Sequence, residues 1–166
     1  DAGGALGAAL YVSHVLLGEP RQGALKTPFL GQGYGQDEVE GFLRDTRIRH
    51  RVFADEASLN RHVANRLADG EVGGLFSGRF EWGPRALGNR SIIADPRRSD
   101  TRERVNRSVK FREPFRPFAP AVLADQASTW FQLSTTRPDF LTDHMLSVVP
   151  VTEAGRETLG AVTHVD

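Results

Sequence analysis

The chain of 166 residues is 39% hydrophobic and 25% charged, and its 21 basic and 21 acidic side chains cancel. This composition is typical of a soluble globular domain with a core of its own. Because the chain has no cysteine, it can form neither disulfides nor thiolate metal sites, which fits a cytoplasmic location. No segment approaches the ~20 consecutive apolar residues that span a bilayer, so we expect no membrane partner.

The amino-terminal part predicts a helix that packs in a domain mostly outside this chain. The chain starts at Asp1 and its sole methionine is Met145, so we expect a piece of a longer protein. Leu and Val recur at helical spacing over residues 4–17 with almost no polar face, which predicts a buried helix. No matching apolar partner follows within thirty residues, so we expect that partner in a domain mostly outside this chain. Residues 19–36, with two prolines and four glycines, predict a linker or ordered loop.

The middle of the chain alternates helix and strand signals. A short helix is expected at 37–45 and a strand at 49–53. Asp55 is expected to cap a helix that continues to about residue 68, because its leucines and valine form an apolar stripe. A buried strand is expected at 72–76, which places the following loop at its carboxyl end, where α/β folds bind ligands.

The remaining signals complete a mixed α/β fold. Helices are expected at 100–108 and 127–131. Strands are expected at 91–94, 120–123, 146–149 and 160–165.

Residues 78–120 concentrate the positive charge of the chain. They contain five acidic residues and eleven basic ones, namely Arg79, Arg85, Arg90, Arg97, Arg98, Arg102, Arg104, Arg107, Lys110, Arg112 and Arg116. Glycines and prolines interrupt these cations and set the direction of the backbone. Basic groups on such a rigid frame suit a phosphate-rich ligand better than a diffuse polyanion.

The sharpest motif is Gly83-Pro-Arg-Ala-Leu-Gly-Asn-Arg-Ser91. Two glycines bracket Arg85, and an amide, a guanidinium and a hydroxyl donor follow. We expect the loop to wrap phosphate oxygens with backbone N–H groups and guanidinium forks. It lacks the Gly-Lys-Ser/Thr ending of a Walker A loop. The alternative is an ordinary structural loop with solvated arginines.

The second motif, Lys110–Pro120, alternates cations with aromatic residues. We expect Phe111, Phe115 and Phe118 to anchor it in the core while its cations face a ligand. Arginine beside aromatic rings also suits single-stranded nucleic acid, and a proline-rich connector with snorkelling charges is a further alternative. Residues 97–107 predict the exposed face of a helix with solvated charges, and no chemistry is assigned to them.

Together these motifs resemble a known family. The stretch Gly78-Arg-Phe-Glu-Trp-Gly-Pro-Arg-Ala-Leu-Gly-Asn-Arg-Ser-Ile-Ile-Ala-Asp-Pro-Arg97, then Asn106, Val109-Lys110, Arg112-Glu113 and Phe115-Arg-Pro-Phe-Ala-Pro120, is similar to ATP-dependent O-carbamoyltransferases of the nodulation and antibiotic-tailoring type. The resemblance implies that residues 1–18 end an actin-like ATPase-fold domain that bears iron. It further implies a linker and short helix at 19–49, and a YrdC-like α/β domain, truncated at its carboxyl end, at 50–166.

The resemblance also implies a reaction. Carbamoyl phosphate and ATP would form carbamoyl-adenylate in the YrdC-like domain, and the carbamoyl group would then move to a hydroxyl of a small natural product. The full-length protein would hold Fe(II), with Asp1 as one ligand, and Mg is a further candidate. This chain alone is expected to be inactive, with the remainder of the parent chain as its partner.

Adenylate formation places negative charge on phosphate oxygens, so preorganised cations would carry most of the catalysis. The predicted catalytic residues are Arg79, Arg85, Lys110 and Arg112. The predicted cofactor-binding residues are Glu81, Asn89, Arg90, Ser91, Asn106 and Arg116.

Two other functions stay open at this point. One is a threonylcarbamoyl-adenylate synthase for tRNA modification. The motif Gly-Pro-Arg-Ala-Leu-Gly argues against it. The other is a non-catalytic nucleic-acid-binding module. Such modules carry a domain-wide basic excess, which this chain lacks, so nucleic acid is not the expected partner.

Overall fold

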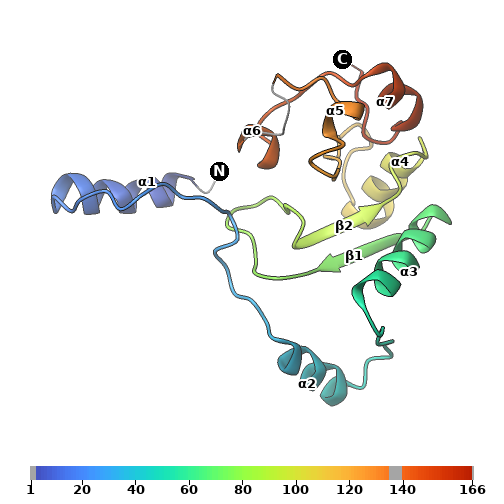
Figure 1. Ribbon diagram of the computed structural model, residues 1–166, viewed down its shortest axis with the longest axis horizontal. Helices are drawn as coiled ribbons and strands as arrows, with labels where there is room; N and C mark the ends of the chain where they lie inside the picture. The colour runs from blue at the N-terminus through green and yellow to red at the C-terminus, as the bar shows by residue number, and fades with distance from the viewer. Residues whose placement is uncertain (1–2, 135–139, 166) are drawn as a thin grey trace. The chain divides into compact units, whose positions relative to one another are not determined.

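The computed structural model describes residues 3–134 and 140–165 (Figure 1). The chain forms two compact units, Asp1–Arg51 with Leu75–Ser91, and Val52–Gly74 with Ile92–Asp166. Helices and one two-stranded sheet confirm the mixed α/β class. The domain limits expected from the resemblance, 1–18, 19–49 and 50–166, stay a prediction.

The first unit opens with the expected apolar helix. It consists of α1 (Gly3–Tyr11) and a π-helical continuation, η1 (Val12–Leu16). Its apolar side chains are not covered in the described chain, since Leu16 is 64% and Leu17 69% exposed. The expected helix is therefore confirmed, and the expected burial is absent from the residues described.

The second helix, α2 (Gln36–Thr46), begins where a carboxylate receives the preceding backbone N–H. Gly35 donates its N–H to Glu38 Oε2 at 2.8 Å, which satisfies a donor at the helix start. This helix confirms the one expected at 37–45. In the described part of the chain, no helix combines the length and the apolar character needed to cross a membrane.

The second unit is built from short helices around a small core. They are α3 (Glu56–Ala68), α4 (Thr101–Val105) with its π-helical continuation η2 (Asn106–Lys110), α5 (Ala127–Trp130), α6 (Phe140–Asp143) and α7 (Glu153–Thr158). Asp55 caps α3 as expected, because its side chain accepts the Ser58 N–H at 2.7 Å. The buried apolar residues are Val105, Ala127, Phe131, Leu159 and Ala161.

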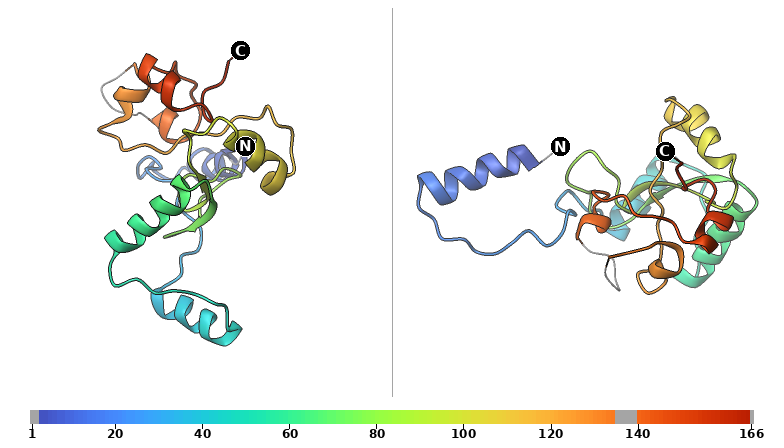
Figure 2. Two further views of the ribbon diagram at one scale, coloured as in Figure 1. Left: turned by 90° about the vertical axis from the view of Figure 1, so that its right-hand side faces the viewer. Right: turned by 90° about the horizontal axis from the view of Figure 1, so that it is seen from above.

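Helices α5 and α7 lie side by side in each view (Figures 1 and 2). The carbonyl oxygen of Trp130, at the end of α5, accepts the backbone N–H of Thr152 at 3.0 Å. Thr152 in turn caps α7, since its hydroxyl accepts the Gly155 N–H at 3.1 Å. The predicted helical turn at 127–131 is thus confirmed, and its end is fixed to α7.

The sheet consists of β1 (Val72–Phe76) and β2 (Arg90–Ala94), which run in opposite directions in Figure 1. Both strands confirm the sequence prediction. The loop that contains the sharpest motif leaves the carboxyl end of β1, as expected. The expected burial of the first strand is wrong, because Leu75 is 41% and Phe76 51% exposed.

Four predicted strands are wrong, at 49–53, 120–123, 146–149 and 160–165. A strand needs a neighbour that exchanges a ladder of hydrogen bonds with it, and within residues 3–134 and 140–165 none of these runs has such a ladder. Val52 and Val148 are 79% and 96% exposed, so a run of apolar residues was not enough to produce a buried, paired strand. After residue 160 the chain instead turns back on α7, where Val162 and Thr163 donate their N–H groups to the Leu159 carbonyl oxygen.

Candidate functional site

The loop between the strands folds around a carboxylate. Glu81 is the only buried residue among the described residues of the first unit, and its side chain is fully enclosed. Its Oε1 accepts three backbone N–H groups, from Leu87 at 2.8 Å, Asn89 at 2.8 Å and Arg90 at 3.2 Å. Three converging N–H groups form the kind of concave nest that binds an anion.

Two glycines give the loop this shape. Gly83 has φ +99° and Gly88 has φ +112°, a region that side-chain-bearing residues rarely adopt. Gly88 stands between two of the residues whose N–H groups converge, so its conformation aims them at one point. In this structure the three N–H groups therefore do not face an external ligand, and the expectation that the loop binds phosphate oxygens stays a prediction for its other donors. The anion that fills the nest is the chain's own Glu81.

The nest stabilises the charged form of this carboxyl. Burial raises the pKa of Glu81, but the hydrogen bonds from the backbone of Leu87, Asn89 and Arg90 outweigh burial and lower the pKa to about 2. Glu81 is therefore ionised at all pH values near neutrality. It supplies a fixed negative charge inside a loop that is otherwise rich in arginine.

Arg90 uses that negative charge to fix its orientation. Its Nε donates to Glu81 Oε2 at 3.3 Å, and its guanidinium carbon lies 4.3 Å from the centre of the Phe80 ring. One edge and one face of the guanidinium are thus engaged by the protein. The side chain remains 42% exposed, and its terminal nitrogens have no hydrogen-bond partner in the described part of the chain.

The other predicted residues of this loop brace it. Arg79 donates Nε to the Gly31 carbonyl at 2.8 Å and a terminal nitrogen to the Leu30 carbonyl at 3.0 Å. The Asn89 side-chain amide donates to the Arg79 carbonyl at 2.7 Å. Ser91 Oγ accepts the Gly88 N–H at 3.0 Å. Arg85 is exposed on the same loop.

The predicted residues of the second motif are organised by a buried amide. Asn106 has no exposed surface, and its Oδ1 accepts Arg112 Nε at 2.6 Å. Its Nδ2 donates to the carbonyl oxygens of Pro114 at 3.1 Å and Arg116 at 2.9 Å. Asn106 therefore holds the following loop in place in this structure. Direct contact of this side chain with a ligand, as expected from the sequence, stays a prediction.

The aromatic residues of the second motif do not lie as predicted. Phe111 is 84% and Phe115 67% exposed, so the expectation that they anchor the segment in the core is wrong. Phe118 is half-buried, and the Arg112 guanidinium carbon lies 4.8 Å from its ring centre. The buried polar contacts of Asn106 take the anchoring role that the sequence assigned to phenylalanine.

The two cations left on this motif differ in their surroundings. Arg116 pairs with Glu113 at 2.7 Å, and both side chains are about half exposed. Lys110 is exposed and has no ion pair in the described part of the chain. Lys110 is the last residue of η2 and precedes Phe111, whose φ of +49° marks a sharp change of direction.

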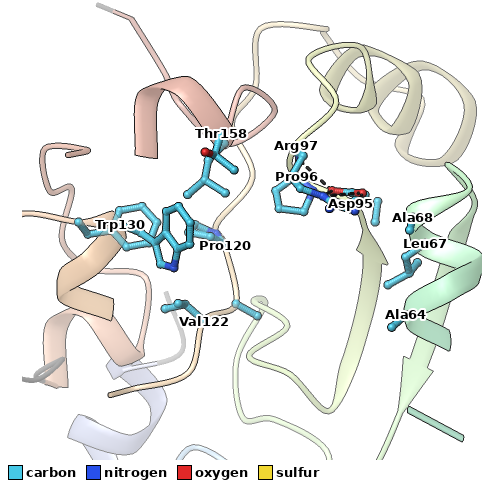
Figure 3. Close-up of a pocket in the computed structure, with 14 residues that line it drawn as sticks. Ala64, Leu67, Ala68, Asp95, Pro96, Arg97, Pro120, Val122, Trp130 and Thr158 are labelled. Atoms are coloured by element: carbon cyan, nitrogen blue, oxygen red, sulfur yellow. Dashed lines mark hydrogen bonds and ion pairs between the residues drawn. The ribbon is translucent and has the colours of Figure 1, made fainter. Parts of the chain in front are cut away.

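The second unit also contains a cavity of about 400 Å3 (Figure 3). Its walls are mainly apolar, with Trp130, Pro120 and Val122 on one side. The opposite wall carries Asp95, which is buried and pairs with Arg97 at 2.6 Å. Hydrogen bonds from Arg97 hold the pKa of Asp95 below its usual range, against the opposing effect of burial.

This pair was not expected from the sequence. The arginines from residue 97 onward were expected on a solvated helix face, although Arg97 stands two residues after a carboxylate and next to proline. That Asp-Pro-Arg spacing is the signal that could have found it. None of the predicted site residues lines the cavity.

The structure thus gathers the predicted residues into two groups. The first group is Arg79, Glu81, Arg85, Asn89, Arg90 and Ser91, in the first unit. The second group is Asn106, Lys110, Arg112 and Arg116, in the second unit. Asp1, the predicted iron ligand, lies outside the described residues. Within those residues, no three His, Cys, Asp or Glu side chains form a group that could hold a metal.

Both groups fall inside a segment that matches a family of known proteins. Residues 64–166 match the carbamoyltransferase C-terminus. The chain belongs to this carbamoyltransferase family. The membership confirms the resemblance expected from the motif residues, and the matched segment includes every predicted site residue except Asp1.

Three relatives show the range of the carbamoyltransferase family. The whole chain is 46% identical to nodulation protein NolNO of Sinorhizobium fredii and covers 24% of that protein. It is 41% identical to nodulation protein NolO of Bradyrhizobium diazoefficiens, covering 30%, and 34% identical to 3'-hydroxymethylcephem-O-carbamoyltransferase of Streptomyces clavuligerus, covering 28%. The chain thus spans less than a third of these relatives' length.

Proposed function

We propose that this chain contributes the carbamoyl-adenylate-forming part of an ATP-dependent O-carbamoyltransferase. The observation that supports the proposal most directly is that the family match includes both cation-bearing loops in full. Each loop also has a rigid frame, built on Glu81 in one case and on Asn106 in the other. The YrdC-like character of this part and a cytoplasmic location belong to the same proposal.

The chemistry proceeds in balanced steps. Carbamoyl phosphate and water give carbamate and phosphate, and a carbamate oxygen then attacks the α-phosphorus of ATP. A P–O bond forms, pyrophosphate leaves, and carbamoyl-adenylate results. A substrate hydroxyl next attacks the carbamoyl carbon, and AMP leaves. Positioning and charge stabilisation dominate such phosphoryl chemistry, which explains a site with arginines and a lysine and no nucleophilic side chain.

The acceptor in this proposal is a hydroxyl of a small molecule. Support comes from the relative whose name specifies a 3'-hydroxymethylcephem as the group that is carbamoylated. The proposed binding of iron and magnesium is supported by the family resemblance alone. Asp1 is the candidate iron ligand in this chain.

Lys110 offers a test with an internal control, because Lys26 is the chain's other lysine and lies outside both motifs. In a protein of the relatives' full length that carries this chain, Lys110→Ala should reduce ATP–pyrophosphate exchange about a hundredfold, the usual effect of losing one preorganised donor. Arg85→Ala should do the same, and Lys26→Ala should exchange like the wild type. Exchange within threefold of wild type for Lys110→Ala and Arg85→Ala would overturn the assignment.

One observation favours a second candidate, a nucleic-acid-binding module. Phe111 and Phe115 are exposed beside Lys110 and Arg116, and exposed rings near cations are a stacking platform for single strands. Titration with a single-stranded oligonucleotide at two salt concentrations decides the matter. Binding that falls steeply with salt, together with normal exchange in Lys110→Ala, would favour this candidate.

A further inference from the structure

The nest in the first unit is closed to an external phosphate, because Glu81 already occupies it. Its three N–H donors lie 2.8 to 3.2 Å from Oε1, and the carboxylate is fully enclosed. A substrate oxyanion would have to expel a buried, ionised side chain to reach them. These three N–H groups are therefore closed to a ligand, which directs attention to the side chains of the loop.

Arg90 is the group with the right geometry. Its Nε is fixed by Glu81 Oε2 and its face by the Phe80 ring, so the guanidinium plane has a defined direction. Its two terminal nitrogens have no hydrogen-bond partner in the described part of the chain. Two such N–H groups on a planar fork match the spacing of two oxygens on one phosphate or carboxylate.

Neighbouring Arg79 shows the contrast. Both Nε and a terminal nitrogen of Arg79 donate to backbone carbonyls of Gly31 and Leu30. That guanidinium is committed to joining two segments of the chain. Arg90 is instead held at one edge and open at the other, which is the arrangement of a ligand-binding side chain.

We infer that Glu81 is a positioning residue, which acts through Arg90 to present a bidentate fork to a substrate oxyanion. The inference rests on the proposed function, in which carbamoyl phosphate and ATP supply the oxyanions. Glu81 contributes twice, since Oε1 fixes the backbone of residues 87–90 and Oε2 fixes the Arg90 guanidinium.

A double-mutant cycle tests this coupling, with inorganic pyrophosphate as the probe and a protein of the relatives' full length as the carrier of this chain. Arg90→Ala should weaken pyrophosphate binding about tenfold to a hundredfold, the usual effect of losing charge-assisted hydrogen bonds. Glu81→Gln should weaken it about tenfold in the wild-type background. In the Arg90→Ala background, the same Glu81→Gln change should have no further effect, because its route to the ligand is gone.

Two control variants make the outcome unambiguous. Glu38→Gln removes another carboxylate that accepts a backbone N–H in the same unit, and should leave pyrophosphate affinity unchanged. Arg90→Lys keeps the charge but lacks the planar fork, and should lose about tenfold in affinity. If Glu81→Gln fails to fold, Arg90→Lys still tests whether the planar guanidinium contacts the oxyanion. Arg90 is partly exposed, so we expect the fold to tolerate a lysine at this position.

Wild-type affinity in Arg90→Lys, or an equal effect of Glu81→Gln in both backgrounds, would overturn the inference. In either case the proposed function would still hold if the wild-type protein exchanged ATP with pyrophosphate and Lys110→Ala abolished that exchange. A protein that neither binds pyrophosphate nor exchanges it would overturn both.

Discussion

Asn89 donates its backbone N–H to Glu81 Oε1 at 2.8 Å and its side-chain amide to the Arg79 carbonyl at 2.7 Å. One residue thereby joins the buried carboxylate to the strand-like segment that precedes it. Both partners precede Asn89 in the chain, so the loop closes on itself. Contacts from outside the loop hold it as well, because Arg79 donates to the carbonyl oxygens of Leu30 and Gly31.

Acid should weaken the first unit through Glu81. Its pKa in the fold is about 2, below the ordinary value of 4.5, so the unfolded chain takes up the proton first as pH falls. The stabilisation is fully present above pH 4.5 and is lost between pH 4.5 and about 2. Urea unfolding of the wild type and Glu81→Gln across that range measures it. The difference between their unfolding free energies should shrink toward pH 2.

At neutral pH, Glu81→Gln should cost about 1–3 kcal/mol, because a neutral amide replaces the ionised acceptor and turns a donor toward Arg90. Glu38→Gln, which alters an exposed helix start, should cost less than about 1 kcal/mol. Asp95, Asp100 and Glu113 also have lowered pKa values, so the comparison between variants isolates Glu81 from them. A pH profile of Glu81→Gln parallel to that of the wild type would contradict the assignment.

Removing the Asn106 side chain should unravel the second motif. Asn106→Ala leaves the Arg112 Nε and the carbonyls of Pro114 and Arg116 without their buried partner. We expect a loss of about 2–4 kcal/mol in unfolding free energy. Asn60→Ala, an exposed position on α3 of the same unit, should stay within about 0.5 kcal/mol of wild type. Thermal unfolding of the two variants side by side is the measurement, and equal effects would refute the role of Asn106.

The exposed apolar end of the first helix should promote self-association. Val15, Leu16 and Leu17 are 58%, 64% and 69% exposed and adjacent, and contiguous apolar surface attracts other chains. Leu16→Glu combined with Leu17→Lys should lower the concentration-dependent light scattering of this chain. Leu123→Glu changes a leucine that is 72% exposed in the second unit, and should have less effect. The reverse order of the two effects would argue against this surface.

The sequence predicted elements whose signals are local. Asp55 before an apolar stripe predicted α3 with its cap, and the short run at 72–76, expected to be a buried strand, predicted β1. The strand expected at 146–149 failed because pairing depends on a partner far along the chain, which no local pattern encodes. The ligand of the nest was missed for a similar reason. Glu81 fills the nest only because the chain turns at Gly83 and Gly88. The motif does not show that turn, so it suggested an external anion.

The same distinction applies to the second motif. Phe111 and Phe115 were expected to be buried because they are apolar, whereas the buried residue is Asn106. An amide can be buried when each of its polar atoms finds a partner, and Asn106 makes three such hydrogen bonds. Those partners lie six, eight and ten residues away, and no helical or strand periodicity marks them in the sequence.

A glycine inside α7 should be indispensable. A Cβ atom at Gly155 would lie 2.5 Å from Val151 Cγ1 and 2.6 Å from the Trp130 carbonyl oxygen. That oxygen cannot withdraw, because it also accepts the Thr152 N–H at 3.0 Å and thereby ties α5 to α7. Alanine favours a helix over glycine by ~1 kcal/mol, but overpacking costs ~1–3 kcal/mol, so the clash should prevail.

Gly155→Ala should therefore lower the unfolding free energy of the second unit by about 1–2 kcal/mol. Gly74→Ala is the matched control, because it lies in the same unit and a Cβ there meets nothing within 4 Å. Urea unfolding followed by Trp130 fluorescence, in a Trp82→Phe background, reports on the α5–α7 contact directly. If Gly155→Ala proved as stable as Gly74→Ala, the close approach of α7 to the Trp130 carbonyl would be wrong.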